Sequence, residues 1–336
     1  MQKFEKIEKF NFYTYPVDLE IVKQYTQLYS RTLDTKETQR LLRWVINGLT
    51  WLCLKLTWRT AYNLGTAIGI LLYHLRIRRK VAMVNLNIVF GQSKSKQELE
   101  HIYKTSMINI GRLILNYIRL PHQSPAFWKE KVHIVNMHLF SDALKENRGV
   151  IVLAAHLGII DLASGCLGQT GYPIAVVGKR IKSPFWDKFV LDSRLLMNVG
   201  TISHRSSMKR ILKGLKCGEI IVMALDQNMR RKLGTFLNWM GRPASSVYAS
   251  GYLAQKLKVP IVAGYCWQKG PQEFETIFTE RVAWQPYPED PQKEILINAQ
   301  THADAVQRMI LSHPEIWFWI HKRWRIQPDG IEDPYK

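Results

Sequence analysis

The sequence predicts an α/β fold in which a largely parallel sheet is flanked by helices. Two observations support this: short, continuous apolar runs recur in the C-terminal two thirds of the chain, and amphipathic helical segments separate them. A third observation concerns the N-terminal side, where a longer apolar stretch precedes this alternating region. With 336 residues, 46% of them hydrophobic, the chain can build a large core.

Residues 1–40 are polar and aromatic without a clear period, and we interpret them as an N-terminal appendage. They begin with "MQKFEKIEKFNFYTYP", which lacks the apolar core of a signal peptide, so we expect the chain to stay on the cytoplasmic side. The chain turns apolar from Leu41 to Leu75, but its longest uncharged run, Thr60 to Leu75, has 16 residues. A regular membrane-spanning helix needs about 20.

Three tryptophans in this stretch, Trp44, Trp51 and Trp58, recur every seven residues and would share one face of a continuous helix. The basic cluster "RIRRK", Arg76 to Lys80, follows directly. Tryptophans beside basic residues are typical of a membrane interface with anionic lipid. We therefore predict an N-terminal apolar helical membrane-associating segment over residues 41–80, lying on the membrane or spanning it. A core helix packed on the rest of the chain is the alternative.

The remaining residues, 81–336, form the predicted α/β domain. It begins with an amphipathic helix in which Ser95 and Glu98 match a capping box and which Pro121 ends. The apolar runs expected to be strands are Val150 to Ala154, Ile174 to Val177, Ile220 to Leu225 and Val259 to Tyr265. The helical segments between and after them are Asp161 to Cys166, Phe185 to Met197, Met208 to Lys216, Val247 to Leu257 and Lys293 to His313. The aromatic and basic "WFWIHKRW" that follows could meet lipid or form a packed strand.

The charge balance predicts anionic partners. Lys and Arg number 47 against 27 Asp and Glu, a net charge of +20, which suits lipid head groups, an acidic carrier protein or nucleic acid. No nucleic-acid-binding signature is present, so we expect no nucleic acid partner. The four cysteines form no CxxC pair, and there is neither a P-loop nor a G-x-G-x-x-G motif. We therefore expect a reducing compartment, no metal and no cofactor.

The stretch "VIVLAAHLGIID" places His156 directly after a predicted strand and Asp161 five residues later. Catalytic residues of open α/β sheets gather at the carboxyl ends of strands. If a helix starts near Gly158, the turn lets the two side chains meet, so that the carboxylate holds one imidazole nitrogen and the other takes a proton from an alcohol. A buried histidine tied to a helix start is the alternative for so short a motif.

Four ordered blocks strengthen this interpretation: "AAHLGIIDLASG", "VVGKRIKSPFWDKFVLDSRLLMNVG", "ALDQNMRRKLGTFLNWMGRPASSVYASGYLAQKLKVPIVAGY" and "HPEIWFWIHKRWR". From about Leu64 to Pro328 the chain resembles the bacterial lipid A biosynthesis late acyltransferase family, part of the wider H-x4-D/E lysophospholipid acyltransferase superfamily. The resemblance implies an inner-membrane O-acyltransferase, facing the cytoplasm, that moves a fatty acyl chain from a thioester to a hydroxyl of a lipid A precursor.

The resemblance also implies roles for single residues. His156 would be the general base and Asp161 its orienting acid. The substrate-binding positions implied are Lys179 or Arg180, Arg194, Asp226, Gln227 and, in the small-residue turn "GRPASS", Arg242. The implied donor is an acyl carrier protein, with acyl-coenzyme A as the other possibility. The alternatives are a lysophospholipid acyltransferase of the same superfamily and a catalytically silent membrane-binding protein on this fold.

Overall fold

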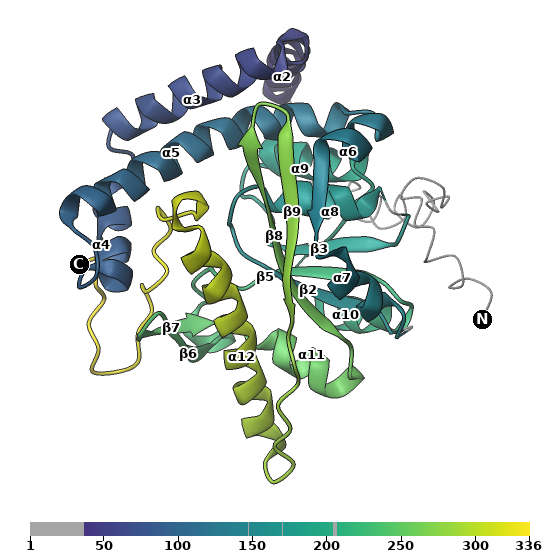
Figure 1. The fold of residues 1–336 in the computed structure, drawn as a ribbon, viewed down its shortest axis with the longest axis vertical. Helices are drawn as coiled ribbons and strands as arrows, with labels where there is room; N and C mark the ends of the chain where they lie inside the picture. Colours follow the sequence, from purple (N-terminus) through teal and green to yellow (C-terminus); the bar gives the residue numbers. More distant parts are fainter. Residues whose placement is uncertain (1–36, 147, 170, 204–206) are drawn as a thin grey trace.

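The computed structural model describes residues 37–336 except 147, 170 and 204–206, so the greater part of the predicted appendage lies outside the described residues. Seven strands of the described chain form one sheet in the order β1-β9-β8-β2-β5-β3-β4, and β6 (Thr235–Trp239) and β7 (Arg242–Ser246) form a separate hairpin (Figure 1). The strands of the sheet are β1 (Val132–Val135), β2 (Val150–Ala154), β3 (Ile174–Gly178), β4 (Gly200–Ser203), β5 (Ile220–Ala224), β8 (Ile261–Gly270) and β9 (Glu273–Arg281).

The sheet is mostly parallel, as the sequence predicts. Strands β8, β2, β5, β3 and β4 run parallel to one another, whereas β9 is antiparallel to β8, and β1 is parallel to β9. The four apolar runs expected to be strands correspond to β2, β3, β5 and β8. These strands carry continuous apolar sequence because helices cover both of their faces.

The helices lie on both sides of this sheet (Figure 1). Alternate residues of β2 face opposite ways: Ile151 and Leu153 belong to the core on one side of the sheet, and Val150 and Val152 to the core on the other side. The described helices are α2 (Glu37–Lys55), α3 (Trp58–His74), α4 (Arg79–Phe90), α5 (Lys96–Arg119), α6 (Pro125–Lys131), α7 (Met137–Leu144), α8 (Ile160–Gly168), α9 (Pro184–Leu196), α10 (Ser207–Lys216), α11 (Ala249–Leu257) and α12 (Pro291–Ser312).

The capping box predicted at the start of α5 is confirmed. The Glu98 amide donates to Ser95 Oγ over 3.2 Å, and the Ser95 amide donates to Glu98 Oε2 over 2.7 Å. Each end of the motif satisfies a backbone N–H that the helix itself cannot pair.

The apolar N-terminal stretch forms two helices rather than the single helix on which the three tryptophans would align. Helix α2 ends at Lys55, and Thr57 starts α3 by accepting a hydrogen bond from the Thr60 amide over 3.1 Å. Trp44 and Trp51 are 78% and 63% exposed on α2. Trp58 instead stacks on a ring of the neighbouring α6, so its predicted place on the same face is wrong. None of the described helices is both long and apolar enough to cross a membrane.

Glycines bring α3 and α5 into backbone contact, and Figure 1 shows the two helices running side by side. A Cβ at Gly111 would lie 2.2 Å from the Gly65 oxygen and 2.4 Å from the Gly69 nitrogen. A Cβ at Gly69 would lie 2.3 Å from the Ile108 Cα. Because these are backbone atoms, a methyl group at either position forces the two helices apart.

The aromatic C-terminal segment lies inside the protein without forming a strand, so both alternatives given for it, tryptophans in contact with lipid and a packed strand, are wrong. Trp317, Trp319 and Trp324 are all buried, and Arg323 is fully buried with them. The predicted "GRPASS" turn is also corrected. Residues Arg242–Ser246 are strand β7, paired with β6 (Thr235–Trp239), and the turn between them consists of Met240 and Gly241, both with positive φ.

The glycine contacts predict that alanine lowers stability at Gly69 and Gly111 but not at Gly48. Gly69→Ala and Gly111→Ala should each lower the free energy of unfolding by about 1–3 kcal/mol, because overpacking displaces α3 from α5. Gly48→Ala is the matched control, since Gly48 is also helical but a Cβ there meets nothing within 4 Å. Urea unfolding of the three purified variants tests this. Equal stability of all three would contradict the proposed packing.

Candidate active site

The site is built at the carboxyl ends of β2 and β5. These neighbouring parallel strands pair in register, with Ala154 opposite Ala224, and the Leu225 amide continues the ladder by donating to the Ala154 oxygen over 3.1 Å. His156 and Asp226 each follow two residues after this pair. Because parallel strands in register end at the same height, the two side chains meet.

Asp226 binds His156 through both of its carboxylate oxygens. The distance from His156 Nδ1 to Asp226 Oδ1 is 2.9 Å, and the His156 amide donates to Oδ2 over 3.0 Å. The Trp317 indole Nε1 donates to the same Oδ2 over 2.8 Å. A carboxylate only accepts hydrogen bonds, so Nδ1 carries the proton and the lone pair of the neutral imidazole lies on Nε2.

Two other segments fix the turn that presents His156. Gly158 has φ +62°, and a Cβ on it would lie 2.0 Å from the Cys266 oxygen of β8. The Gly158 amide donates to the Ile316 oxygen over 2.9 Å, and the Phe318 amide donates to the His156 oxygen over 3.1 Å. The turn is therefore held between β8 and the C-terminal segment, at a position where only glycine fits.

The pair is electrostatically coupled. Burial alone lowers the pKa of His156, but the attraction of Asp226 and their hydrogen bond outweigh it and place the pKa above its usual value. Burial raises the pKa of Asp226, yet the charge and hydrogen bond of His156 with the Trp317 donor bring it down to about 2. Asp226 thus remains charged while His156 changes its protonation state.

The Nε2 side of the imidazole, which is turned away from Asp226, faces Gln227. The side-chain nitrogen of Gln227 lies 3.0 Å from His156 Nε2 and donates to its lone pair. The His156 side chain is 37% exposed, against 3% for Asp226. The unprotonated nitrogen therefore belongs to the more exposed residue of the pair, and its hydrogen-bond partner is the Gln227 amide.

Asp161 does not make the contact with His156 that the sequence predicts. Its Oδ1 accepts a hydrogen bond from Arg194 Nε over 2.6 Å, and its Oδ2 accepts one from the Tyr117 hydroxyl. The reason is local, because Asp161 is the second residue of α8 and extends toward α9 and α5 instead of back toward the turn. Asp161 and Arg194 form a buried ion pair beside the site, and its charges still affect the pKa of His156.

The other predicted binding residues are distributed unevenly. Lys179 and Arg180 follow β3, the strand next to β5, and are exposed at the same edge of the sheet, where Arg180 Nε donates to Asp187 Oδ2 over 2.9 Å. Arg242 lies beside the turn of the β6–β7 hairpin and donates to the Glu332 oxygen over 2.8 Å. The structure therefore brings Asp226 and Gln227 onto His156 and leaves Arg242 in the C-terminal packing.

Sequence reasoning missed the roles of Trp317 and Tyr117. Trp317 was considered a lipid-facing or strand residue, and Tyr117 only a member of an amphipathic helix face. One feature of the sequence could have indicated both roles. Each ring carries a polar group, the indole N–H of Trp317 or the phenol O–H of Tyr117, and this group needs a hydrogen-bond partner once the ring is buried. Across the part of the chain that the structure describes, no group of three or more His, Cys, Asp or Glu side chains could hold a metal ion.

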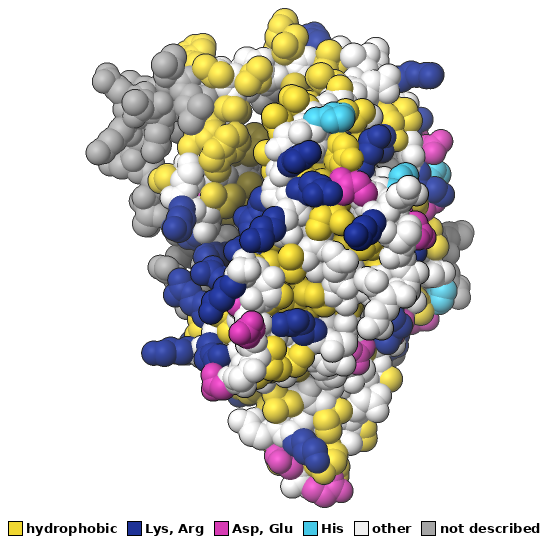
Figure 2. All heavy atoms as spheres, turned by 90° about the vertical axis from the view of Figure 1, so that its left-hand side faces the viewer, with side chains coloured by type: hydrophobic (Ala, Val, Ile, Leu, Met, Phe, Trp, Pro, Cys, Tyr) yellow, Lys and Arg dark blue, Asp and Glu magenta, His cyan; other side chains and the backbone are white. Residues whose placement is uncertain are grey.

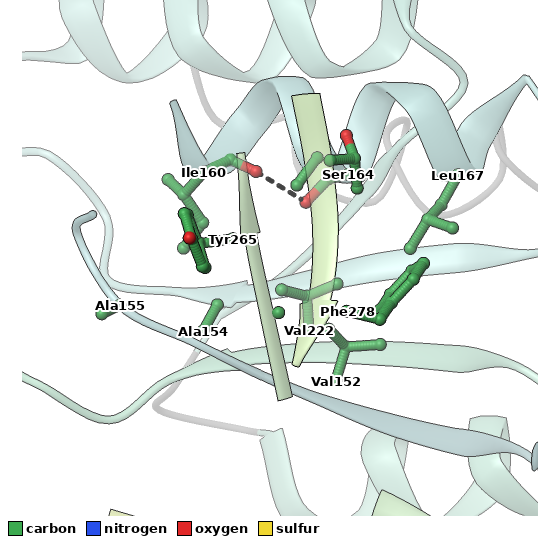
Figure 3. A pocket seen from close by; sticks show the side chains of 12 residues that line it. Val152, Ala154, Ala155, Ile160, Ser164, Leu167, Val222, Tyr265 and Phe278 are labelled. Carbon is green, nitrogen blue, oxygen red and sulfur yellow. Dashed lines mark hydrogen bonds between the residues drawn. The ribbon is translucent and has the colours of Figure 1, made fainter. Parts of the chain in front are cut away.

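A narrow apolar pocket begins beside the turn that presents His156, between α8 and the sheet (Figure 3). Its volume is about 10 Å³, enough for about one water molecule. The Ser164 hydroxyl donates to the Ile160 oxygen, which satisfies the polar group within the lining. The pocket-lining residues labelled in Figure 3 are Val152, Ala154, Ala155, Ile160, Ser164, Leu167, Val222, Tyr265 and Phe278.

Known proteins match nearly the whole chain. A family model described as "Bacterial lipid A biosynthesis acyltransferase" matches residues 30–326. The chain is 21% identical over 299 residues to the lipid A biosynthesis lauroyltransferase of Escherichia coli (strain K12), covering 88% of this chain and 94% of that protein. It is 22% identical to the palmitoleoyltransferase of the same organism with the same two coverages. A lipid A biosynthesis acyltransferase of Haemophilus influenzae is 23% identical, with 80% of this chain and 85% of that protein covered.

The two carboxylates should affect His156 differently. Asp226→Asn should lower the pKa of His156 more than Asp161→Asn does, because Asp226 supplies both the nearest opposite charge and the hydrogen bond to Nδ1. Asp161→Asn should instead lower the free energy of unfolding by about 3–5 kcal/mol, since it leaves Arg194 buried without its partner. Histidine NMR titration and urea unfolding measure the two effects. A larger pKa change in Asp161→Asn would contradict this assignment.

Proposed function

Because the chain belongs to the bacterial lipid A biosynthesis acyltransferase family, we propose that it transfers a fatty acyl chain from a thioester to a hydroxyl of a lipid A precursor. The family match confirms the resemblance that the four sequence blocks indicate, and the chain is an acyltransferase by membership. The observation that carries the finer proposal is the His156–Asp226 pair, which supports a general base at the edge of the sheet. An intact pair also disfavours a catalytically silent protein.

In the proposed reaction the acceptor hydroxyl replaces the Gln227 amide at His156 Nε2. Nε2 takes the hydroxyl proton while the hydroxyl oxygen attacks the thioester carbonyl carbon. The new C–O bond forms, the C–S bond breaks, and the imidazolium returns the proton to the departing thiolate. Asp226 keeps its negative charge throughout and stabilises the imidazolium, with the Trp317 donor holding it in place.

The basic side chains at the same edge suit an anionic substrate. Lys179 and Arg180 are exposed where β3 ends, next to the strand that carries Asp226, and we assign them to phosphate groups of the donor or acceptor. Arg194 is held by Asp161, so its proposed contribution is to position α8 and α9 beside the site. The donor is proposed to be an acyl carrier protein, whose acidity complements the +20 charge of the chain.

The apolar pocket in Figure 3 is the proposed site for the start of the acyl chain. It begins at Ala155, directly before His156, and its lining is almost entirely hydrocarbon. A chain attached to the reacting carbonyl would therefore leave water as it entered. With a volume of about 10 Å³ the pocket must widen on binding, and this requires α8 to move or the lining side chains to rotate.

The exposed face of α2 and α3 is the proposed membrane contact. Figure 2 shows hydrophobic side chains gathered at the top of this side of the molecule, with Lys and Arg side chains below them. A basic segment, Arg76 to Lys80, follows α3 directly, in the order expected for apolar insertion beside anionic head groups. The exposed apolar residues of the two helices and the residue after them are Trp44, Val45, Leu49, Trp51, Leu52, Leu54, Leu64, Leu71 and Leu75.

The reaction is tested with His156→Ala. Because general-base assistance accounts for about 10² to 10⁴-fold in rate, acyl transfer to a lipid A precursor should fall by that factor while the fold and the membrane association persist. The assay compares acyl carrier protein and acyl-coenzyme A as donors, with circular dichroism as the folding control. His138→Ala, at an exposed position of α7, is the matched histidine control. Near-normal turnover of folded His156→Ala would refute the proposed mechanism.

The membrane contact is tested with the double variant Trp44→Ser and Trp51→Ser. Burial of a large apolar side chain is worth about 1.5–3 kcal/mol, so losing two should reduce partitioning into anionic vesicles by about 10²-fold or more. The remaining binding should become sensitive to about 1 M salt, which screens charges beyond about 3 Å. Leu296→Ser is the control, because Leu296 is exposed on α12 instead. Unchanged, salt-resistant binding would place the contact elsewhere.

A further inference from the structure

A second histidine, His321, lies beside the His156–Asp226 pair, and one of its ring nitrogens can only accept a hydrogen bond. The backbone amide of Asn228 donates to His321 Nε2 over 3.1 Å. A backbone amide can only donate, so Nε2 must be the unprotonated nitrogen. In the neutral ring the proton is therefore on Nδ1, which makes no hydrogen bond with the described residues and is available as a donor.

The fold places His321 next to the reacting groups. Its partner Asn228 follows Gln227, whose amide lies 3.0 Å from His156 Nε2. Four residues before it, Trp317 donates to Asp226, and the Asn85 side chain donates to the His321 oxygen over 2.7 Å. The contact of Trp317 with Asp226 and the contact of Asn85 with the His321 oxygen therefore hold the chain segment that carries His321.

His321 is also neutral at physiological pH. Burial lowers its pKa most, and the attraction of Asp226 is opposed by the positive charges of Arg323, His156 and Arg78, so that the pKa is about 4. A neutral imidazole donates a hydrogen bond without giving up its proton, which is the property needed where negative charge develops only briefly.

Four donors around His156 are already engaged. The His156 amide donates to Asp226, the Gly158 amide to Ile316 and the Phe318 amide to His156 itself. The Trp317 indole is occupied by Asp226. A carbonyl oxygen placed at His156 would therefore find these four groups engaged, whereas Nδ1 of His321 makes no hydrogen bond with the part of the chain that the structure describes.

We propose that His321 is a further catalytic residue, donating from Nδ1 to the carbonyl oxygen of the acyl thioester. This inference rests on the proposed acyl transfer with His156 as base. When the hydroxyl oxygen attacks, the carbonyl electron pair moves onto that oxygen, and the His321 N–H stabilises the resulting anion. The C=O bond then re-forms, the C–S bond breaks, and the sulfur receives its proton from His156. His321 keeps its own proton throughout.

Two isosteric changes separate catalysis from structure. Gln places its amide oxygen near the position of Nε2, so His321→Gln keeps the acceptor for the Asn228 amide and loses the Nδ1 donor. Asn places its amide nitrogen near the position of Nδ1, so His321→Asn keeps the donor and loses the acceptor. Loss of one oxyanion donor typically costs about 10² to 10³-fold in kcat.

We expect His321→Gln to unfold like the wild type but to lose about 10² to 10³-fold in kcat, with little change in KM. His321→Asn should be less stable yet retain more turnover than His321→Gln. The opposite order, with full kcat in His321→Gln, would make His321 a structural anchor and overturn the proposal. His156→Ala measured beside them separates the two hypotheses. If it stays active, the general-base mechanism fails, and if it is inactive while His321→Gln is normal, only the role of His321 fails.

A measurement of the protonation state of His321, which does not depend on enzyme turnover, completes the test. Nitrogen NMR of the full-length protein with labelled histidine, assigned through the His321→Asn variant, reports which ring nitrogen carries the proton. We expect His321 to hold its proton on Nδ1 and to stay neutral from about pH 6 to 8, since its pKa is about 4. A proton on Nε2, or titration within this range, would refute the assignment.

Discussion

The hydrogen bond between His156 Nδ1 and Asp226 Oδ1 exists because β2 and β5 are parallel neighbours in register, and the remaining features of the site follow from it. A shift of one residue would turn one side chain to the opposite face of the sheet and separate the pair. The register is secured by the continuous apolar packing of both strands on two helical layers. Core packing therefore sets the distance between His156 and Asp226, and the C-terminal segment adds the Trp317 donor that keeps the carboxylate oriented.

The sequence predicted the fold where burial leaves a strong pattern. Strands β2, β3 and β5 are continuous apolar runs because both of their faces are covered. Such runs can be recognised in the sequence without knowing which strands pair with them. Strand β9 was missed although Phe274, Thr276 and Phe278 alternate with more exposed residues, a half-buried pattern. The break between α2 and α3 was missed for another reason. Heptad spacing assumes one continuous helix, and the cap at Thr57 interrupts it without a proline or glycine.

At the site, the sequence pointed to His156 as the candidate base but did not pair it with Asp226. His156 was predictable because a histidine after a buried strand lies at the catalytic edge of an α/β sheet. The choice between Asp161 and Asp226 was not, because a local spacing of five describes one turn, whereas strand pairing joins residues 70 positions apart. Asp226 was expected only to contact substrate.

The position of the aromatic C-terminal segment was not predictable either. Tryptophans among arginines suit a membrane interface and a buried segment equally well, and contacts of this segment with α4 and the β6–β7 hairpin determine which occurs.

The electrostatics of the site depend on charges that do not titrate near neutrality. Arg323 is fully buried, stacked 4.2 Å over Trp239, and donates to Ser245 and Ser246, with no carboxylate among its hydrogen-bond partners in the described chain. Burial lowers its pKa only to about 9, so it remains a cation near Asp226. Asp226, with a pKa of about 2, remains an anion, and His321, with a pKa of about 4, remains neutral. Among these four groups, we assign the proton exchange to His156, whose pKa Asp226 raises above the usual histidine value. Its lone pair is available only above its raised pKa, so the proposed reaction should gain rate as pH rises through that value, and the protein tunes this threshold through Asp226.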